Sequence, residues 1–449
     1  MLTESSMPEP KIRVLHVGKY YPPFHGGIEN FLCDLAECQL EQGDVEPSVL
    51  VHQHEVGRAE EAETANGVFV RRVRIIGRAL FTPFALLFLR SLNRTIEERN
   101  PDILHLHLPN PSTFWCLFSK SARKRPWIIH WHSDVLGGAP NWAVRLAYPV
   151  YRIFEWALLK RSKCIIATSP PYLETSAPLA EFNHKCQVVP LGIKSLSSQQ
   201  GVESAQKTMA SDRGHSGEQV TEESDGADIT SKSKRLNASN LGSKWDMAST
   251  PDADSHPAAT ERAPLKVLSI GRLTYYKGHE HLIRAVAKTP HVQLDIVGDG
   301  EEHGSLLKLI EALSLSERVR ILGSLPQADL EDVLSNCDLV CLPSVERTEA
   351  FGLVLLEAAR AGKPSLVTCV KGSGMTWVVQ NGITGWTVEP GSAEDLQRVL
   401  ADISKNRSEL SQRGQLARER FSREFQIAAV ANRIQTLYSK VGGRYTPLP

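Results

Sequence analysis

The sequence predicts an α/β protein with two Rossmann-like domains that face each other across a cleft. Three observations support this prediction. Apolar strand-like segments alternate with helical ones early in the chain, and again after residue 263. Between these blocks, residues 195–263 are rich in Ser, Asp, Glu, Thr and Ala and have few large apolar side chains to bury. The length of 449 residues also exceeds what one hydrophobic core normally organises.

Four segments follow from this pattern. We expect a first Rossmann-like domain at 1–194 and a low-complexity, disordered insert or linker at 195–263. A second Rossmann-like domain is expected at 264–425. The last segment, 426–449, is predicted to be a helix that packs back toward the first domain, followed by a tail.

The first domain begins with a strand, a Pro/Gly loop and a helix that ends near Gly43. Further strand candidates are VEPSVLVH, VFVRRVRII, ILHLHL, WIIHWH, CIIAT and CQVVPLG. Helical stretches between several of them predict a largely parallel sheet that is covered on both faces. The most apolar run, 79–89, is about half the ~20 residues that a membrane-spanning helix needs. It predicts a partly buried helix, with a surface that dips into a membrane interface as the alternative.

Composition narrows the class of protein. The chain has 51 Lys and Arg against 51 Asp and Glu, which argues against a general nucleic-acid binder. Its eight cysteines are scattered, with no CxxC pair and no zinc-finger spacing, as expected in a reducing, cytosolic setting. The first ten residues, MLTESSMPEP, lack the features of a signal peptide.

In the second domain, the stretch EAFGLVLLE places Glu349 and Glu357 around an apolar segment. It follows the strand-like DLVCLP and predicts a helix from near Gly352 to near Gly362. The first amides of that helix, around Phe351 to Val354, would form an anion site suited to a phosphate. Because two carboxylates would repel a phosphate, we expect them to bind neutral hydroxyls, as on a sugar and a ribose.

Two cations balance these carboxylates. In GRLTYYKG, Arg272 follows a strand end, and Lys277 stands at the entry to a helix. Together they could hold a diphosphate, whereas either alone would be interpreted as a surface side chain. The donor region has no Asp-x-Asp motif, so the sequence indicates no metal-bridged diphosphate and no metal site.

These motifs, with VGDGEEHGSL, VRILGSL and GITGWTVEPGSAEDL, resemble the carboxyl-terminal domain of retaining family-4 glycosyltransferases of the GT-B fold. The resemblance implies that Glu349 contacts hydroxyls of the donor sugar and that Glu357 holds the nucleotide ribose. It implies donor contacts from the backbone at Phe351, Gly352 and Leu353. It also places Arg272 and Lys277 on the diphosphate.

The first domain extends the resemblance. YYPPFHGGIENFLCDLA is similar to the family's first glycine loop, in which the amides of Gly26 and Gly27 approach the diphosphate or the acceptor. The alternative is a tight strand-to-helix turn. IIHWHSDVLG resembles the segment that places a catalytic histidine beside the reacting sugar, here His132, with Asp134 nearby. His130 is the competing candidate, and a buried structural histidine is the alternative.

WHSD, SPPYLETS, KCQVVPLGI and KGSGMTWVVQNGITG resemble the branch that transfers mannose or rhamnose in bacterial surface polysaccharide synthesis. The donor implied is GDP-mannose first and a UDP-sugar second, with no further cofactor. The resemblance implies a retaining, metal-independent hexosyltransferase in which the leaving diphosphate helps to deprotonate the acceptor. The rival functions are a GT-B nucleotide-sugar epimerase and a non-catalytic protein that binds nucleotide sugars.

The acceptor side is less defined. A glycan or a polyprenyl-diphosphate-linked oligosaccharide is the expected acceptor, in the cytoplasm. The basic and aromatic segments 120–127 and 145–163 could dock peripherally on the inner face of the cytoplasmic membrane. An ordinary solvated basic face is the alternative.

Overall fold

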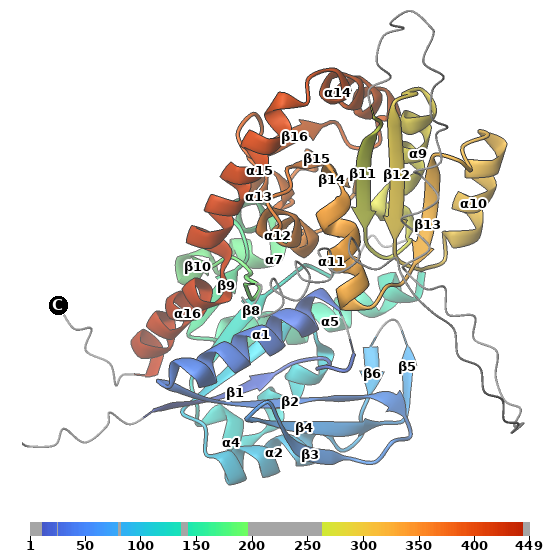
Figure 1. Cartoon of the computed structure of the whole chain (residues 1–449). Helices are drawn as coiled ribbons and strands as arrows, with labels where there is room; N and C mark the ends of the chain where they lie inside the picture. The colour runs from blue at the N-terminus through green and yellow to red at the C-terminus, as the bar shows by residue number, and fades with distance from the viewer. Residues whose placement is uncertain (1–10, 25, 80–81, 136–141, 196–262, 443–449) are drawn as a thin grey trace, which may run out of the picture.

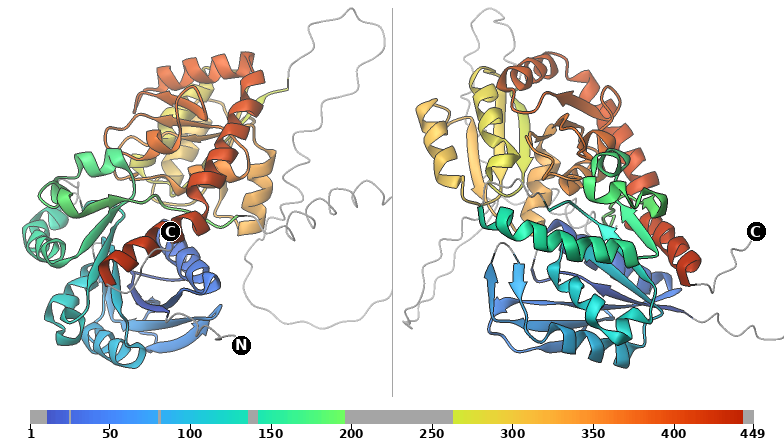
Figure 2. Two further views of the ribbon diagram at one scale, coloured as in Figure 1. Left: turned by 90° about the vertical axis from the view of Figure 1, so that its left-hand side faces the viewer. Right: turned by 180° about the vertical axis from the view of Figure 1, so that it is seen from behind.

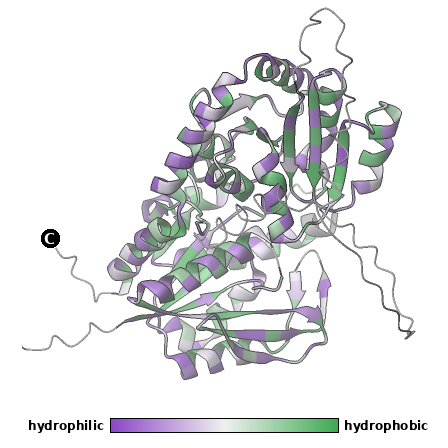
Figure 3. Cartoon of the chain, viewed as in Figure 1, coloured by the Kyte–Doolittle hydropathy of each residue, from purple (hydrophilic) through white to green (hydrophobic). Residues whose placement is uncertain are grey.

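The chain forms two parallel β-sheets, each covered by helices (Figure 1). The structure, a computed structural model, describes residues 11–24, 26–79, 82–135, 142–195 and 263–442. The predicted insert at 195–263 therefore lies almost entirely outside the described residues. Figure 3 shows that the strands of both sheets are largely apolar, whereas the outer faces of the helices are polar.

The first sheet has eight strands. They are β1 (Ile12–Val17), β2 (Val45–Val56), β3 (Glu61–Ala65), β4 (Val68–Ile75), β7 (Ile103–Leu108), β8 (Trp127–Trp131), β9 (Cys164–Ala167) and β10 (Cys186–Val188). Their order across the sheet is β10-β9-β8-β7-β1-β2-β4-β3, and only the edge strand β3 runs antiparallel to its neighbour. The strand order reverses between β1 and β7, which is where open α/β sheets bind ligands.

The helices of this domain are α1 (Gly27–Gln42), α2 (Phe88–Arg99), α3 (Trp115–Phe118), α4 (Lys120–Arg123), α5 (Trp142–Arg161), α6 (Pro170–Thr175) and α7 (Ala177–Ala180). Helix α1 ends where Gly43 adopts a left-handed conformation, as the sequence predicted.

The second sheet has six parallel strands. They are β11 (Leu265–Ile270), β12 (Val292–Val297), β13 (Val319–Gly323), β14 (Leu339–Leu342), β15 (Ser365–Thr368) and β16 (Gly385–Val388). The order β13-β12-β11-β14-β15-β16 is that of a doubly wound fold, and it reverses between β11 and β14. The helices are α9 (His279–Ala287), α10 (His303–Ala312), α11 (Gln327–Asn336), α12 (Leu353–Arg360), α13 (Met375–Val378), α14 (Ala393–Lys405) and α15 (Ser408–Arg420).

The last helix, α16 (Ile427–Gly442), returns to the first domain and lies along α1 (Figures 1 and 2). At this junction the backbone of Ile193 bonds to Phe425 and Ile427, with N···O distances of 3.2 and 3.0 Å. One hydrophobic cluster takes side chains from α1, α12 and α16, including the fully buried Phe31 and Tyr438. Because this core is shared, the two domains are packed together as well as connected by the chain.

The predicted α/β class with two parallel sheets is therefore confirmed. The predicted buried helix over 79–89 is wrong. Strand β6 (Thr82–Phe84) pairs with β5 (Gly77–Ala79), and α2 begins only at Phe88. Pro83 explains the difference, because proline disrupts a helix interior but is tolerated in an edge strand. No helix among the described residues has the length and apolar character needed to span a bilayer.

Candidate functional site

The loops at the reversal point of the second sheet bring Lys277 and Glu349 together. Lys277 follows β11 and Glu349 follows β14, the two strands that flank this point. Lys277 Nζ lies 2.5 Å from Glu349 Oε2, and both side chains are only 12 % exposed. Burial by itself lowers the pKa of Lys277, but the adjacent Glu349 carboxylate outweighs it and raises that pKa overall. Lys277 therefore stays protonated, and the pair is largely shielded from water.

The backbone around Glu349 is fixed by the loop that follows β15. Ser373 Oγ donates to the carbonyl of Glu349, and Gly374 N donates to the carbonyl of Ala350 at 2.8 Å. A Cβ on Gly374 would lie 3.0 Å from that carbonyl oxygen and 2.8 Å from Ser169 Oγ. This close packing explains why Gly374, the second glycine of KGSG, stands here, and the two hydrogen bonds hold the backbone that carries Glu349.

Arg272, the second predicted diphosphate ligand, is more open. Its guanidinium lies 3.3 Å from the Glu301 carboxylate, and both side chains are more than half exposed. A solvated pair of this kind contributes little to stability. Arg272 therefore reaches the surface beside the buried Lys277–Glu349 pair, on the same loop after β11.

Helix α12 starts where the sequence predicts it to start. Gly352 precedes it with a φ of +79°, and a Cβ there would lie 2.9 Å from both Leu342 and Leu355. Only glycine suits this position. The turn leads Phe351 and Gly352 into Leu353, and the first amides of α12 have no acceptors within the helix. This end of α12 meets the first domain, because a Cβ on Gly27 would lie 3.1 Å from Leu353 Cδ1.

The glycine loop of the first domain thus faces the start of α12. Gly26 is the N-cap residue of α1 in an extended conformation, and Gly27 is its first residue. A Cβ on Gly26 would lie 2.4 Å from Glu29 Oε2, which is a flexible side-chain end. The sequence placed these glycines and Leu353 in one site, and the structure brings Gly27 and Leu353 into contact.

Glu357 occupies a different environment from Glu349. It lies in the middle of α12 and is half-buried, and its side-chain carboxylate accepts no hydrogen bond from any described residue. Burial raises its pKa; the nearby Arg360 opposes this shift, while Glu331 and Asp34 add to it. Asp34 belongs to α1, so Glu357 also lies close to the first domain. A half-buried carboxylate with no donor is suited to accept hydrogen bonds from a diol.

His132 lies directly after β8, at the carboxyl end of the first sheet, and is 3 % exposed. Its ring stacks on His130 with centroids 4.4 Å apart, and its Nε2 lies 3.0 Å from His107 Nδ1. Burial lowers the pKa of His132 to about 3, so the ring is neutral at physiological pH. His132 Nδ1 has no partner among the described residues. His130 lies two residues earlier, within β8, and neither of its ring nitrogens has a hydrogen-bond partner among the described residues.

Asp134, the residue that the sequence placed near His132, is already engaged. One carboxylate oxygen accepts from Trp131 Nε1 at 2.8 Å and from Ser176 Oγ at 2.7 Å. The other accepts from Arg347 Nη1 at 2.6 Å. Arg347 also donates to the Tyr172 carbonyl at 3.1 Å, and its guanidinium lies 4.0 Å from the Tyr172 ring centroid. Asp134 and Arg347 therefore form a buried ion pair between the domains, which the sequence analysis missed.

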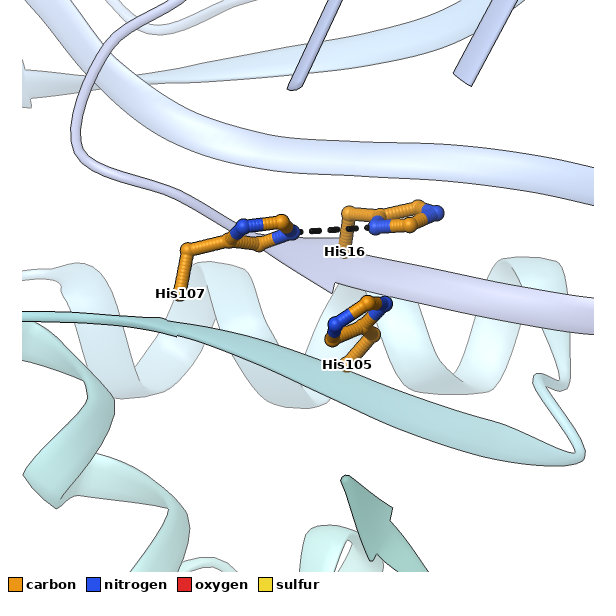
Figure 4. A group of neighbouring side chains, drawn as sticks. All are labelled: His16, His105 and His107. Carbon is orange, nitrogen blue, oxygen red and sulfur yellow. Dashed lines mark hydrogen bonds between the residues drawn. The ribbon is translucent and has the colours of Figure 1, made fainter. Parts of the chain in front are cut away.

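Five buried histidines extend inward from His132 on one face of the first sheet. Their positions are 16, 105, 107, 130 and 132. Two overlapping triplets, 16/105/107 and 107/130/132, each have one nitrogen per ring within 4.8 Å of the others (Figure 4 shows the first triplet). His130 and His132 are parallel within 3°, so their in-plane lone pairs do not converge as a metal ion requires. In the second triplet, a hydrogen bond already joins His107 to His132.

Comparison with known proteins now identifies the family. Residues 26–192 match the glycosyl transferase 4-like domain, and residues 253–420 match the glycosyl transferases group 1 domain. The O-antigen chain mannosyltransferase C of Escherichia coli is 25% identical over 95% of this chain and 98% of that protein. The D-rhamnosyltransferase WbpZ of Pseudomonas aeruginosa is 24% identical over 92% of each chain.

Solved structures show the same fold. Sucrose-phosphate synthase from Thermosynechococcus elongatus superposes with a TM-score of 0.68 at 18% identity, covering 97% of this chain and 100% of that one. Anabaena HepE, solved in complex with UDP, gives a TM-score of 0.64 at 18% identity over 96% and 100%. The resemblance that the sequence motifs suggested is confirmed: this chain belongs to the group 1 glycosyltransferases of family 4, which are retaining enzymes of the GT-B fold.

Proposed function

We propose that this glycosyltransferase moves a hexose, with mannose as the first choice, from a nucleotide diphosphate sugar to a glycan or a polyprenyl-diphosphate-linked oligosaccharide. The product would be a bacterial surface polysaccharide. The observation that carries the proposal is the buried Lys277–Glu349 pair beside the first turn of α12, at the reversal point of the second sheet. The names of the mannosyl- and rhamnosyltransferase relatives support mannose or rhamnose as the transferred sugar, with GDP-mannose as the first donor to test. The UDP complex of HepE keeps a UDP-sugar second.

In this proposal the donor lies along α12 and the loop after β11. Lys277 and Arg272 bind the diphosphate, which would receive further hydrogen bonds from the amides of Phe351, Gly352 and Leu353. The unbonded Glu357 carboxylate accepts the ribose hydroxyls. Gly27, at the start of α1, limits the site from the first domain because it touches Leu353.

Glu349 orients the sugar rather than attacking it. A carboxylate that is paired with Lys277 at 2.5 Å and fixed through its own backbone can accept hydrogen bonds from sugar hydroxyls. The acceptor oxygen bonds to the anomeric carbon as the bond to the diphosphate breaks on the same face. The acceptor proton passes to the departing phosphate oxygen, whose negative charge Lys277 and Arg272 stabilise. His132 lies beside the sugar.

The first domain also carries a surface suited to an anionic membrane, in the cytoplasm. On α5, Leu146, Val150 and Ile153 recur at helical spacing and are 73%, 58% and 66% exposed. Phe118 of α3 packs against Phe154 of α5 and is itself 55% exposed. Exposed Lys120, Arg123 and Lys124 lie in and directly after α4, and exposed Lys160 lies in the last turn of α5. Apolar residues bordered by cations match a lipid surface with anionic headgroups, where a lipid-linked acceptor would be found.

Flotation with liposomes tests this docking. The wild-type protein should float with vesicles that contain anionic lipid, and the double variant Leu146→Asp/Ile153→Asp should remain in the dense fraction. Ile383→Asp is the matched control, since Ile383 is 50% exposed in the second domain and should not affect flotation. Equal flotation of all three proteins would eliminate the α5 surface as the docking site.

The donor is tested by thermal shift and turnover of the full chain with GDP-mannose, UDP-glucose, UDP-N-acetylglucosamine and GDP. Each is measured with and without chelator, and turnover includes a polyprenyl-diphosphate sugar acceptor. We expect stabilisation by one nucleotide family, unaffected by chelator, and sugar transfer that requires the acceptor. Consumption of the donor without acceptor, or no shift with any nucleotide, would refute the proposal.

A further inference from the structure

Three of the five buried histidines, His16, His107 and His132, are joined to one another by side-chain hydrogen bonds. His107 Nε2 lies 3.1 Å from His16 Nδ1, the bond drawn in Figure 4, while His107 Nδ1 lies 3.0 Å from His132 Nε2. At the far end, His16 Nε2 lies 2.9 Å from the side-chain oxygen of Gln39 on α1. A continuous chain therefore runs from Gln39 through two histidines to His132, across β1, β7 and β8.

Gln39 is itself held from the other side. Its amide nitrogen donates to the Tyr438 hydroxyl at 3.2 Å, and the hydroxyl lies 2.6 Å from His105 Nδ1. Gln39 and Tyr438 are both fully buried, so no water competes for these groups. The amide nitrogen donates to this hydroxyl, and the amide oxygen faces His16.

These hydrogen bonds determine which ring nitrogen carries the proton in His16, His107 and His132. The Gln39 oxygen can only accept, so His16 carries its proton on Nε2 and accepts at Nδ1. His107 must then donate from Nε2 and accept at Nδ1. By the same argument His132 donates from Nε2, and its Nδ1 is a bare acceptor. Burial lowers the pKa of each of these histidines, which keeps every ring neutral with a single proton.

We propose that Gln39 fixes the tautomer of His132 through His16 and His107, so that His132 presents Nδ1 as a hydrogen-bond acceptor for a hydroxyl of the bound sugar. Gln39, His16 and His107 are positioning residues, since they act through His132. The proposal rests on the proposed function only for the location of His132 beside the sugar. The tautomer itself is a property of the unliganded protein.

Nuclear magnetic resonance of the full chain labelled with 15N-histidine tests the tautomer without substrate. We expect His16, His107 and His132 to be neutral and protonated on Nε2. In Gln39→Leu the acceptor is lost, and an Nε2 proton on His16 would be buried without a partner. The direction of each hydrogen bond between these histidines should then reverse, so that all three rings are protonated on Nδ1. His130→Phe is the control, because the His130 ring stacks on His132 but its nitrogens make no hydrogen bond with the described residues. In this variant the tautomers of His16, His107 and His132 should match those of the wild type.

Kinetics then connect the tautomer to transfer. Gln39→Leu should lower kcat about tenfold, because that factor corresponds to the net free energy of one hydrogen bond. KM for the donor should change little. Gln39→Glu keeps an acceptor for His16 and should retain both the Nε2 tautomers and most of the activity. Protonation on Nδ1 in the wild type, or no reversal in Gln39→Leu, overturns the proposal even if the enzyme is active. The expected tautomers in a protein that transfers no sugar would refute the proposed function instead.

Discussion

Lys277 and Glu349 form a buried ion pair, with Nζ 2.5 Å from Oε2, although the sequence assigned them to different parts of the donor. Without ligand, each compensates the charge of the other. A diphosphate that approaches Lys277 therefore meets a cation that is already paired, and the site depends on both residues.

Lys277→Met should leave the Glu349 carboxylate buried without its partner. We expect a loss of about 3 kcal/mol in the free energy of unfolding and a fall of about 100-fold or more in kcat/KM. Denaturant titration and initial-rate kinetics measure the two effects.

The double variant Lys277→Met/Glu349→Gln separates stability from catalysis. It removes both charges and should recover most of the lost stability without recovering activity. Activity close to wild type in Glu349→Ala, with the fold intact, would contradict the assignment of this site.

Arg347→Ala should loosen the contact between the domains. Arg347 holds Asp134 with 17% and 5% of the two side chains exposed, so its loss leaves a buried carboxylate and costs about 3 kcal/mol. Small-angle X-ray scattering should show a larger radius of gyration without donor. Arg398→Ala, which breaks an exposed pair with Asp395 within the second domain, should leave the scattering curve unchanged. Identical scattering curves for the wild type and both variants would disprove a role for the Arg347–Asp134 pair in holding the two domains together.

Glu357→Gln should weaken nucleotide binding without harming the fold. The substitution keeps the shape but removes a charged acceptor, so we expect Kd for the preferred nucleotide to rise about tenfold. Calorimetry with the 2′-deoxy and 3′-deoxy nucleotides gives the sharper comparison. Wild type should lose affinity for a deoxy analogue, whereas Glu357→Gln should barely distinguish it from the parent nucleotide. Equal discrimination by both proteins would place the ribose elsewhere.

The buried histidines should make the protein sensitive to acid. Burial lowers the pKa of His132 to about 3 and of His16 to about 4, and it lowers those of His105, His107 and His130 well below the usual value. Because the pKa of histidine in an unfolded chain is about 6.5, the unfolded state binds more protons between about pH 4 and 6.5. The contribution of the neutral histidines to the free energy of unfolding should therefore be fully present above about pH 6.5 and should fall as the pH drops toward 4.

Denaturant titrations across this pH range measure the effect. Each histidine contributes a slope of up to about 1.4 kcal/mol per pH unit. His130→Phe should reduce the slope near pH 5 by about that amount. An unchanged slope would mean that His130 is not buried in its neutral form.

The sequence was sufficient for the features that depend on local pattern. Alternating strands and helices gave the two parallel sheets, and the loops after β11 and β14 contain the predicted Lys277 and Glu349. The Arg347–Asp134 pair joins residues 213 positions apart, and no local pattern indicates such a contact. The prediction of a helix from the apolar run at 79–89 was wrong, because Pro83 lies in a short hairpin that interrupts the run. Leu86, after the hairpin, is exposed.

The hydroxyl bonded to His105 and Gln39 comes from Tyr438, which follows His105 by 333 positions in the chain. During translation, the first sheet leaves the ribosome long before α16 exists, so His105 and Gln39 are made without their partner. The apolar side of α1 that α16 covers also remains open through the synthesis of the whole second domain. The first half of this protein therefore reaches its final packing only after the second domain and α16 have been made, and a nascent chain arrested before α16 would present a site for chaperones.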